Sequence, residues 1–249
     1  MFPKLKLALF VSGGGTTMEQ ILIACLPGGI LNGLIEVVLV IASKPGIGAI
    51  DKAKKLGLWE NHIVVCESTS YQTPYNYGLA LLEILHHFEV NIILQAGWTP
   101  LTPENVVTEY AGRIYNEHPE FLDHGHPDFG GQGMVGLAAH QARILFLQET
   151  NPPPEERFTE VCCHRVTKKY DEGEVIVTGR VPVKLDDTAE SLQERALPLE
   201  WLVQIFALYM IATNSVRTIQ RTERVVKPGQ EGILDACKRK AMEMYPFHG

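Results

Sequence analysis

Short, predominantly apolar runs recur along the first half of the chain and limit the choice of fold. They lie at Leu5–Val11, Ile35–Ala42 and Val90–Leu94, and amphipathic stretches with helical spacing separate them. A strand that is apolar on both faces must be covered on both faces, as parallel strands are in βαβ units. The sequence therefore predicts an α/β fold with a Rossmann-like, open, mostly parallel twisted sheet and helices on both faces.

The pattern changes in the second half of the chain. Glu160–Val166 and Glu174–Val183 flank a turn and predict a β-hairpin. A long helix is expected from Thr188 to Ile211, interrupted near Pro198. The last stretch is locally basic on an otherwise acidic protein. We predict one large domain over residues 1–212 and a basic C-terminal extension over 213–249, with a helix from about Glu231 to Met244.

Composition excludes several classes of protein. A net charge of -7 argues against binding nucleic acid, because neutralising phosphates needs a concentrated basic face. The five cysteines form no CxxC pair, so we expect no disulfide framework, and a reducing cytoplasm fits best. No wholly apolar run approaches the roughly 20 residues of a spanning helix, so we expect no membrane association.

A glycine-rich turn follows the first apolar run, in the order Ser12-Gly13-Gly14-Gly15-Thr16-Thr17. Glycines between a strand and a helix let backbone N–H groups converge on an anion, and the helix dipole favours negative charge there. The turn matches neither a Walker A sequence nor a GxGxxG fingerprint. We predict a phosphate site, and the alternative is a tight turn without a ligand.

Asn116 and His118 stand two apart at the end of an expected strand, so their side chains share one face. An amide can hydrogen-bond a carbonyl oxygen that becomes an oxyanion, and an imidazole can donate or accept a proton. Asp171, in a later turn, would raise the pKa of His118 so that it is charged at neutral pH. The alternatives are a structural strand end and a carboxylate that caps its own turn.

The loop after His118 is rich in His, Asp and Gly, which raises the question of a metal. The candidates His118, Asp123, His124, His126 and Asp128 match no familiar ligand spacing. A solvated lid explains such a loop better than a metal site does. We therefore expect no metal site.

Together these motifs resemble the folate-dependent formyltransferases, most closely a divergent branch of those that act on phosphoribosylglycinamide. The resemblance covers about residues 5–211. It is carried, in order, by Ser12–Thr17, Ala42-Ser43-Lys44, Ala96-Gly97-Trp98, Tyr110–Arg113, Asn116-Glu117-His118-Pro119, Tyr170-Asp171-Glu172-Gly173 and Val181-Pro182-Val183.

The resemblance implies formyl transfer from 10-formyltetrahydrofolate to the amine of phosphoribosylglycinamide in purine synthesis, without a metal. Asn116 would hold the formyl oxygen, His118 would stabilise and protonate the tetrahedral intermediate, and Asp171 would keep that histidine charged. Both substrates are small molecules, and the resemblance allows a homodimer. The implied binding residues for folate are Trp98, Thr99, Pro100, Leu101, Asn116, Lys168, Lys169 and Tyr170, and those for the acceptor are Gly14, Gly15, Thr16, Thr17 and Glu200.

Two departures from the family pattern leave the acceptor open. The family's phosphate-binding arginine is missing from Thr73-Pro74-Tyr75-Asn76, and the usual Ser-Leu-Leu-Pro continuation after the Asn-x-His-Pro motif reads Glu120-Phe121-Leu122-Asp123. An amino-sugar nucleotide is the alternative acceptor. A non-catalytic nucleotide- or folate-binding protein is the alternative class. A tRNA-specific enzyme is not expected, because about 37 tail residues are too few for a nucleic-acid-binding barrel.

Overall fold

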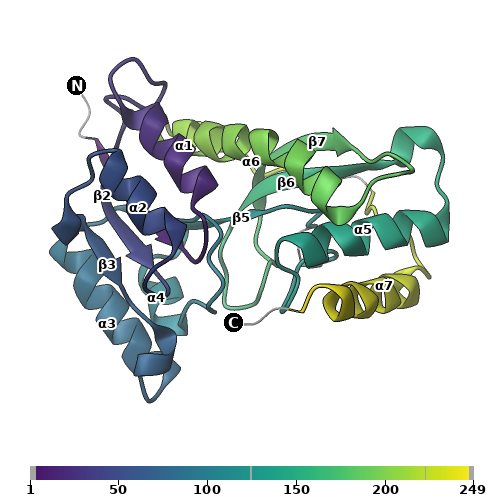
Figure 1. Cartoon of the computed structure of the whole chain (residues 1–249), viewed down its shortest axis with the longest axis horizontal. Helices are drawn as coiled ribbons and strands as arrows, with labels where there is room; N and C mark the ends of the chain where they lie inside the picture. The colour runs from purple at the N-terminus through teal and green to yellow at the C-terminus, as the bar shows by residue number, and fades with distance from the viewer. Residues whose placement is uncertain (1–3, 124, 222, 247–249) are drawn as a thin grey trace. The chain divides into compact units, whose positions relative to one another are not determined.

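The computed structural model describes residues 4–123, 125–221 and 223–246. Seven strands form one sheet in the order β3-β2-β1-β4-β5-β6-β7 (Figure 1). The pairs β3–β2, β2–β1, β1–β4 and β4–β5 are parallel, and β6 pairs antiparallel with β7. The predicted α/β fold and its mostly parallel sheet are confirmed. The strands are β1 (Leu5–Val11), β2 (Ile35–Ala42), β3 (Ile63–Val65), β4 (Ile92–Gln95), β5 (Ile114–His118), β6 (Phe158–Arg165) and β7 (Val175–Pro182).

The helices lie between and after these strands, and the described residues divide into two compact units. The α-helices are α1 (Thr16–Cys25), α2 (Gly48–Lys55), α3 (Pro74–His87), α4 (Glu104–Glu109), α5 (Leu137–Thr150), α6 (Ala189–Ala212) and α7 (Glu231–Met244), and the short 3-10 helices are η1 (Glu60–His62), η2 (Ser68–Ser70) and η3 (Pro154–Glu156). The first unit comprises Met1–Glu117, Arg165–Lys168 and Gln204–Val216, and the second comprises His118–His164, Lys169–Val203 and Arg217–Gly249.

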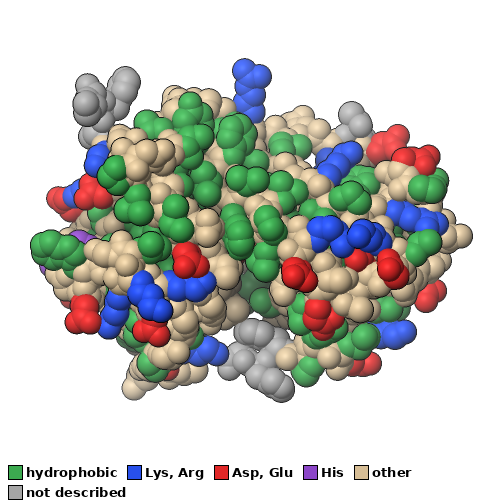
Figure 2. All heavy atoms as spheres, turned by 45° about the horizontal axis from the view of Figure 1, so that its top comes forward, with side chains coloured by type: hydrophobic (Ala, Val, Ile, Leu, Met, Phe, Trp, Pro, Cys, Tyr) green, Lys and Arg blue, Asp and Glu red, His purple; other side chains and the backbone are tan. Residues whose placement is uncertain are grey.

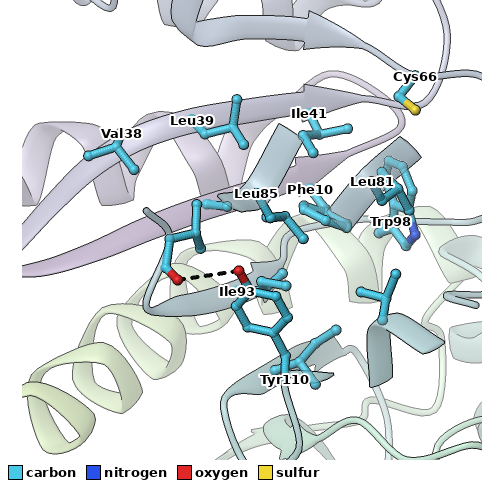
Figure 3. Close-up of a cluster of buried hydrophobic side chains, with 14 of the residues drawn as sticks. Phe10, Val38, Leu39, Ile41, Cys66, Leu81, Leu85, Ile93, Trp98 and Tyr110 are labelled. Atoms are coloured by element: carbon cyan, nitrogen blue, oxygen red, sulfur yellow. Dashed lines mark hydrogen bonds between the residues drawn. The ribbon is translucent and has the colours of Figure 1, made fainter. Parts of the chain in front are cut away.

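In the first unit, β1 is buried on both faces. Leu7 and Leu9 point to one side of the sheet and Ala8 and Phe10 to the other, and all four are fully buried. The side of Phe10 packs against α3 and α4, as the cluster in Figure 3 shows. In the same cluster the Tyr110 hydroxyl donates to the Val90 carbonyl over 3.3 Å. This double burial explains why the strand is apolar from Leu7 to Val11.

In the second unit, α5 packs against α7, and a buried arginine organises the space between α5 and β6. Arg143 is 2% exposed. Its Nε donates to the Phe158 carbonyl over 3.0 Å, and its guanidinium lies 4.8 Å from the centre of the Phe121 ring. A buried guanidinium is tolerated here because carbonyl acceptors and an aromatic face replace its hydration.

Helix α6 differs from its prediction, because it continues through Pro198 without interruption. Proline removes one backbone donor, which leaves the carbonyl of Glu194 four residues earlier without its usual partner. Glu194 and Pro198 are both exposed, so water can satisfy that carbonyl.

Helix α6 also corrects the expectation about apolar stretches. It has 24 residues, and a window with mean hydropathy 1.3 makes it the one described helix that could span a membrane by length and composition. Core helices of soluble proteins pass the same test. Leu202 and Phe206 of α6 are exposed, and Figure 2 shows hydrophobic side chains at the surface of the face that it views.

The core cluster of the first unit gives a direct stability prediction. We expect Leu81→Ala in α3 to lower the free energy of unfolding by about 2–5 kcal/mol, because Leu81 is 0% exposed and its removal leaves a cavity. Leu79→Ala is the matched control in the same helix, since Leu79 is 47% exposed and should cost roughly 0.5 kcal/mol or less. Urea unfolding of both variants measures the difference, and equal losses would contradict this description of the core.

Candidate active site

The glycine turn after β1 adopts a conformation that requires glycine at one position. Gly15 has a φ of 65°, and a Cβ there would lie 2.6 Å from the Cβ of Ala49 at the start of α2. A Cβ at Gly13 or Gly14 would meet no described atom within 4 Å. The backbone conformation and packing at Gly15 therefore require glycine there. Gly14 lies beside open space at the N-terminus of α1, where a ligand could bind.

A neighbouring segment is hydrogen-bonded to this turn. The backbone N–H of Ser12 donates to the carbonyl of Gly97, and the Ser12 hydroxyl accepts from the backbone N–H of Thr99, each over 3.0 Å. These two bonds join the ends of β1 and β4. Parallel strands bring their carboxyl ends to one edge of a sheet, which is where ligands bind in open α/β folds.

Thr17, a predicted acceptor-binding residue, is buried and has a protein partner. Its side chain is hydrogen-bonded to the carboxyl group of Glu117 on β5. Burial raises the pKa of Glu117 to about 7, and the bond with Thr17 opposes that rise. A protonated Glu117 can donate a hydrogen bond beside the glycine turn, where a carboxylate would repel an anion.

Strand β5 carries Asn116 and His118 at its carboxyl end, as predicted. Asn116 is partly exposed and belongs to the first unit, whereas His118 is 4% exposed and opens the second. The alternation of a β-strand places their side chains on one face of β5.

In the second unit, the structure brings His118 and Asp171 together and adds a third residue, His164 of β6. Nδ1 of His118 lies 3.8 Å from Oδ2 of Asp171, and Nε2 of His164 lies 3.4 Å from Oδ1. The backbone N–H of Gly131 donates to Oδ2 over 2.8 Å. Asp171 is thus held from three directions.

The charge state of this cluster differs from the prediction for His118. Desolvation lowers the pKa of His118 to about 4, and it outweighs the opposing effect of Asp171. Burial alone would raise the pKa of Asp171, but the neighbouring imidazoles and the Gly131 N–H hold it well below its usual range. In the free protein at neutral pH, His118 is therefore neutral and Asp171 is ionised. The expectation of a charged His118 is wrong, because it ignored the burial of the ring.

The surroundings of the neutral His118 imidazole indicate which ring nitrogen carries its hydrogen. Nδ1 is the ring nitrogen near the Asp171 carboxylate, and the backbone of Phe129 also bonds to the ring. Nε2 is buried and has no hydrogen-bond partner among the described residues. Because the acceptors lie on the Nδ1 side, we assign the hydrogen to Nδ1 and a lone pair to Nε2. Nε2 is then able to accept a proton from a substrate.

The residues predicted to bind folate lie in different environments. Trp98 packs into the core of the first unit, with its ring centre 4.9 Å from that of Phe10, whereas Leu101 is 52% exposed. Lys168 forms an ion pair with Glu104, and Lys169 pairs with Glu172 over 3.3 Å. The remaining predicted residues are placed as follows: Thr99 and Pro100 after β4, Tyr170 beside Asp171, Thr16 at the start of α1, and Glu200 buried on α6.

His164 is the site residue that sequence reasoning missed. It ends the buried run Val161-Cys162-Cys163 and looks like an ordinary core histidine. The available signal was the hairpin, because a polar residue near the end of β6 lies close to the turn that carries Asp171. Of the metal candidates, His124 lies outside the described residues. The part of the chain that the structure describes holds no group of three or more potential metal ligands.

The lowered pKa of His118 predicts how stability depends on pH. An unfolded histidine binds its proton near pH 6.5, whereas the folded His118 resists protonation until about pH 4. The stability that comes from keeping it neutral is complete above the unfolded pKa and is lost as the pH falls from 6.5 towards 4, by up to about 3 kcal/mol. We expect His118→Asn to reduce this loss in urea unfolding measured across that range. Parallel curves for the two proteins would contradict the assignment.

Comparison with known proteins identifies the family of the chain. The model of the formyl transferase family matches residues 5–207. The chloroplastic phosphoribosylglycinamide formyltransferases of Arabidopsis thaliana and Vigna unguiculata are 32% and 31% identical to the chain, over 85% and 88% of it and 67% and 64% of their own lengths. The solved phosphoribosylglycinamide formyltransferase of Brucella melitensis aligns with a TM-score of 0.69 and 28% identity, covering 87% of this chain and 100% of that one. The chain therefore belongs to the formyl transferase family.

Proposed function

We propose that this protein transfers a formyl group from 10-formyltetrahydrofolate to the amine of phosphoribosylglycinamide, a step of purine synthesis. Family membership and the names of its relatives support the reaction. The observation that carries the chemistry is the buried, neutral His118, with Nδ1 beside an ionised Asp171 and Nε2 without a partner among the described residues.

The reaction needs a group that accepts one proton and a hydrogen-bond donor that stabilises the negative charge developing on the formyl oxygen. As the amine nitrogen bonds to the formyl carbon, the carbonyl electron pair moves to the formyl oxygen. The side-chain N–H of Asn116 donates to that oxygen. His118 Nε2 takes the proton that the amine loses, and Asp171 stabilises the resulting imidazolium. His118 then returns the proton to the folate nitrogen as the bond between that nitrogen and the formyl carbon breaks.

The remaining predicted residues bind the two substrates in this proposal. Backbone N–H groups at Gly14, Gly15 and Thr16 would hold the acceptor phosphate at the N-terminus of α1, with Glu200 on the acceptor amine. The folate would contact the segments around Trp98–Leu101 and Lys168–Tyr170. Trp98 Nε1 is buried without a partner among the described residues, which leaves one donor in the first segment. No step requires a metal.

The segment before α3 bears on the identity of the acceptor. The segment before α3 has no cation, and Thr73 caps that helix by accepting from the backbone N–H of Asn76 over 3.1 Å. Lys44, just after β2, is exposed and is the proposed replacement, since it follows a strand of the same sheet. An amino-sugar nucleotide, whose phosphates need not bind before α3, is the second candidate acceptor.

The proposed compartment is a reducing cytoplasm, and the proposed partners are small molecules. All five cysteines are free thiols, and four of them are buried. A homodimer is compatible with the exposed apolar residues of α6. Neither a nucleic acid nor a membrane is part of the proposed activity.

An activity assay tests the proposed function. The wild-type protein should consume 10-formyltetrahydrofolate in the presence of phosphoribosylglycinamide and release tetrahydrofolate. Turnover with an amino-sugar nucleotide, and none with phosphoribosylglycinamide, would overturn the acceptor but keep the chemistry. No turnover with either amine, despite folate binding, would support a non-catalytic binder.

Two variants test the assigned roles. We expect Asn116→Ala to lower kcat by about 100- to 1,000-fold, because it removes the donor to the oxyanion. His118→Ala should lower kcat by about 100- to 10,000-fold, because it removes the proton acceptor, while folate binding is retained. His86→Ala is the control, since His86 is exposed on α3. Wild-type kcat in either site variant would refute the role of that residue.

A further inference from the structure

The tail after α6 packs onto the unit that contains His118 and Asp171. Helix α7 contacts α5 and buries Leu234, Cys237 and Ala241. These three residues join one apolar cluster with Phe121 and Phe129 of the loop after His118. Residues beyond the family match at 207 therefore contact the loop that follows the proposed proton acceptor.

Lys238 lies on the same face of α7 and reaches the backbone of that loop. Its Nζ donates to the carbonyl of Asp128 over 2.9 Å and to the carbonyl of Gly130 over 2.7 Å. Lys238 is half-buried, so these carbonyls replace much of the water that its ammonium group would bind. The Lys238 side chain thus fixes two backbone carbonyls of the loop, which belong to residues on either side of Phe129.

Phe129 and Gly131, which alternate with Asp128 and Gly130, contact His118 and Asp171, the catalytic pair of the proposed function. The backbone of Phe129 bonds to the imidazole of His118, and the backbone N–H of Gly131 donates to Asp171 over 2.8 Å. Gly130 permits this close approach, because a Cβ there would lie 2.7 Å from the Cβ of Asp171. Along residues 128–131, the backbone therefore contacts Lys238 and the catalytic pair in turn: residues 128 and 130 bond to Lys238, and residues 129 and 131 bond to the catalytic pair.

Two arginines of the tail hold the acidic side chains of the same loop. Nη2 of Arg224 lies 2.5 Å from Oδ1 of Asp128, and Nε of Arg221 lies 2.8 Å from Oδ1 of Asp123. Asp128 has a positive φ of 36°, which is uncommon for a residue other than glycine. The tail therefore supplies the cations that keep this loop in an unusual backbone conformation.

We propose that Lys238 is a positioning residue for formyl transfer, which holds the backbone of residues 128–131 so that Phe129 orients His118 and Gly131 orients Asp171. This inference rests on the proposed function. It assigns the basic tail to the active site of its own chain. The opposing account is that the tail only adds stability to the second unit.

Lys238→Met tests the proposal, because it removes the ammonium group and keeps the length of the side chain. Lys240→Met is the matched control on an exposed position of α7. At a temperature where all proteins are folded, Lys238→Met should lower kcat by roughly 10- to 100-fold, with KM for both substrates within about twofold, because the reacting groups are misplaced. The pH profile of kcat/KM should also shift, while Lys240→Met resembles the wild type.

Hydrogen exchange gives a second measurement that does not depend on turnover. The Gly131 amide should exchange at least about tenfold faster in Lys238→Met than in the wild type, because its bond to Asp171 opens more often. Leu234→Ala removes apolar packing of α7 and keeps the Lys238 ammonium group, so it shows the effect of weaker α7 packing without loss of the Lys238 bonds. If Lys238→Met keeps the wild-type kcat and Gly131 exchange, or loses activity only in proportion to its folded fraction as Leu234→Ala does, the proposal is wrong. An inactive wild-type protein would refute the proposed function, and the exchange experiment would still decide the role of Lys238.

Discussion

The buried carboxylate of Asp171 is the group around which the rest of the candidate site is arranged. An ionised carboxylate inside a protein is stable only when charges or hydrogen bonds replace its hydration. Here His164 and the Gly131 N–H supply them, and Nδ1 of His118 lies 3.8 Å from the carboxylate. Asp171 itself has a positive φ of 53°, which aspartate tolerates better than most residues. The same contacts determine which nitrogen of His118 carries the hydrogen.

This arrangement links the chemistry to a part of the chain beyond the family match. The loop after His118, residues 119–136, lacks the family's usual continuation and contains Asp123, Asp128 and five glycines. Carboxylates in a loop that lies near Asp171 would repel it unless cations balance them. Arg221, Arg224 and Lys238 of the tail supply that balance. The cations of the basic tail thus balance the carboxylates of the divergent loop.

The sequence predicted the fold well because the relevant signals are local. Predominantly apolar runs identified β1 and β2, and the turn around Asp171 identified the β6–β7 hairpin. The same reasoning placed Asn116 and His118 at the end of β5.

Tertiary contacts account for what the sequence did not predict. His164 follows an apolar run, and its role depends on the distance to Asp171. Pro198 indicates a helix break, yet its exposure lets α6 continue. The charge of His118 depends on desolvation, which follows from the packing of the second unit and cannot be read from neighbouring residues.

The central claim is that His118 is a neutral imidazole with its hydrogen on Nδ1 and a free lone pair on Nε2. Nitrogen-15 NMR of the histidine-labelled protein at pH 7, with His118→Asn used to assign the signal, measures this directly. The account predicts a protonated Nδ1 and an unprotonated Nε2 in the protein without substrates. An imidazolium, or a hydrogen on Nε2, would contradict it.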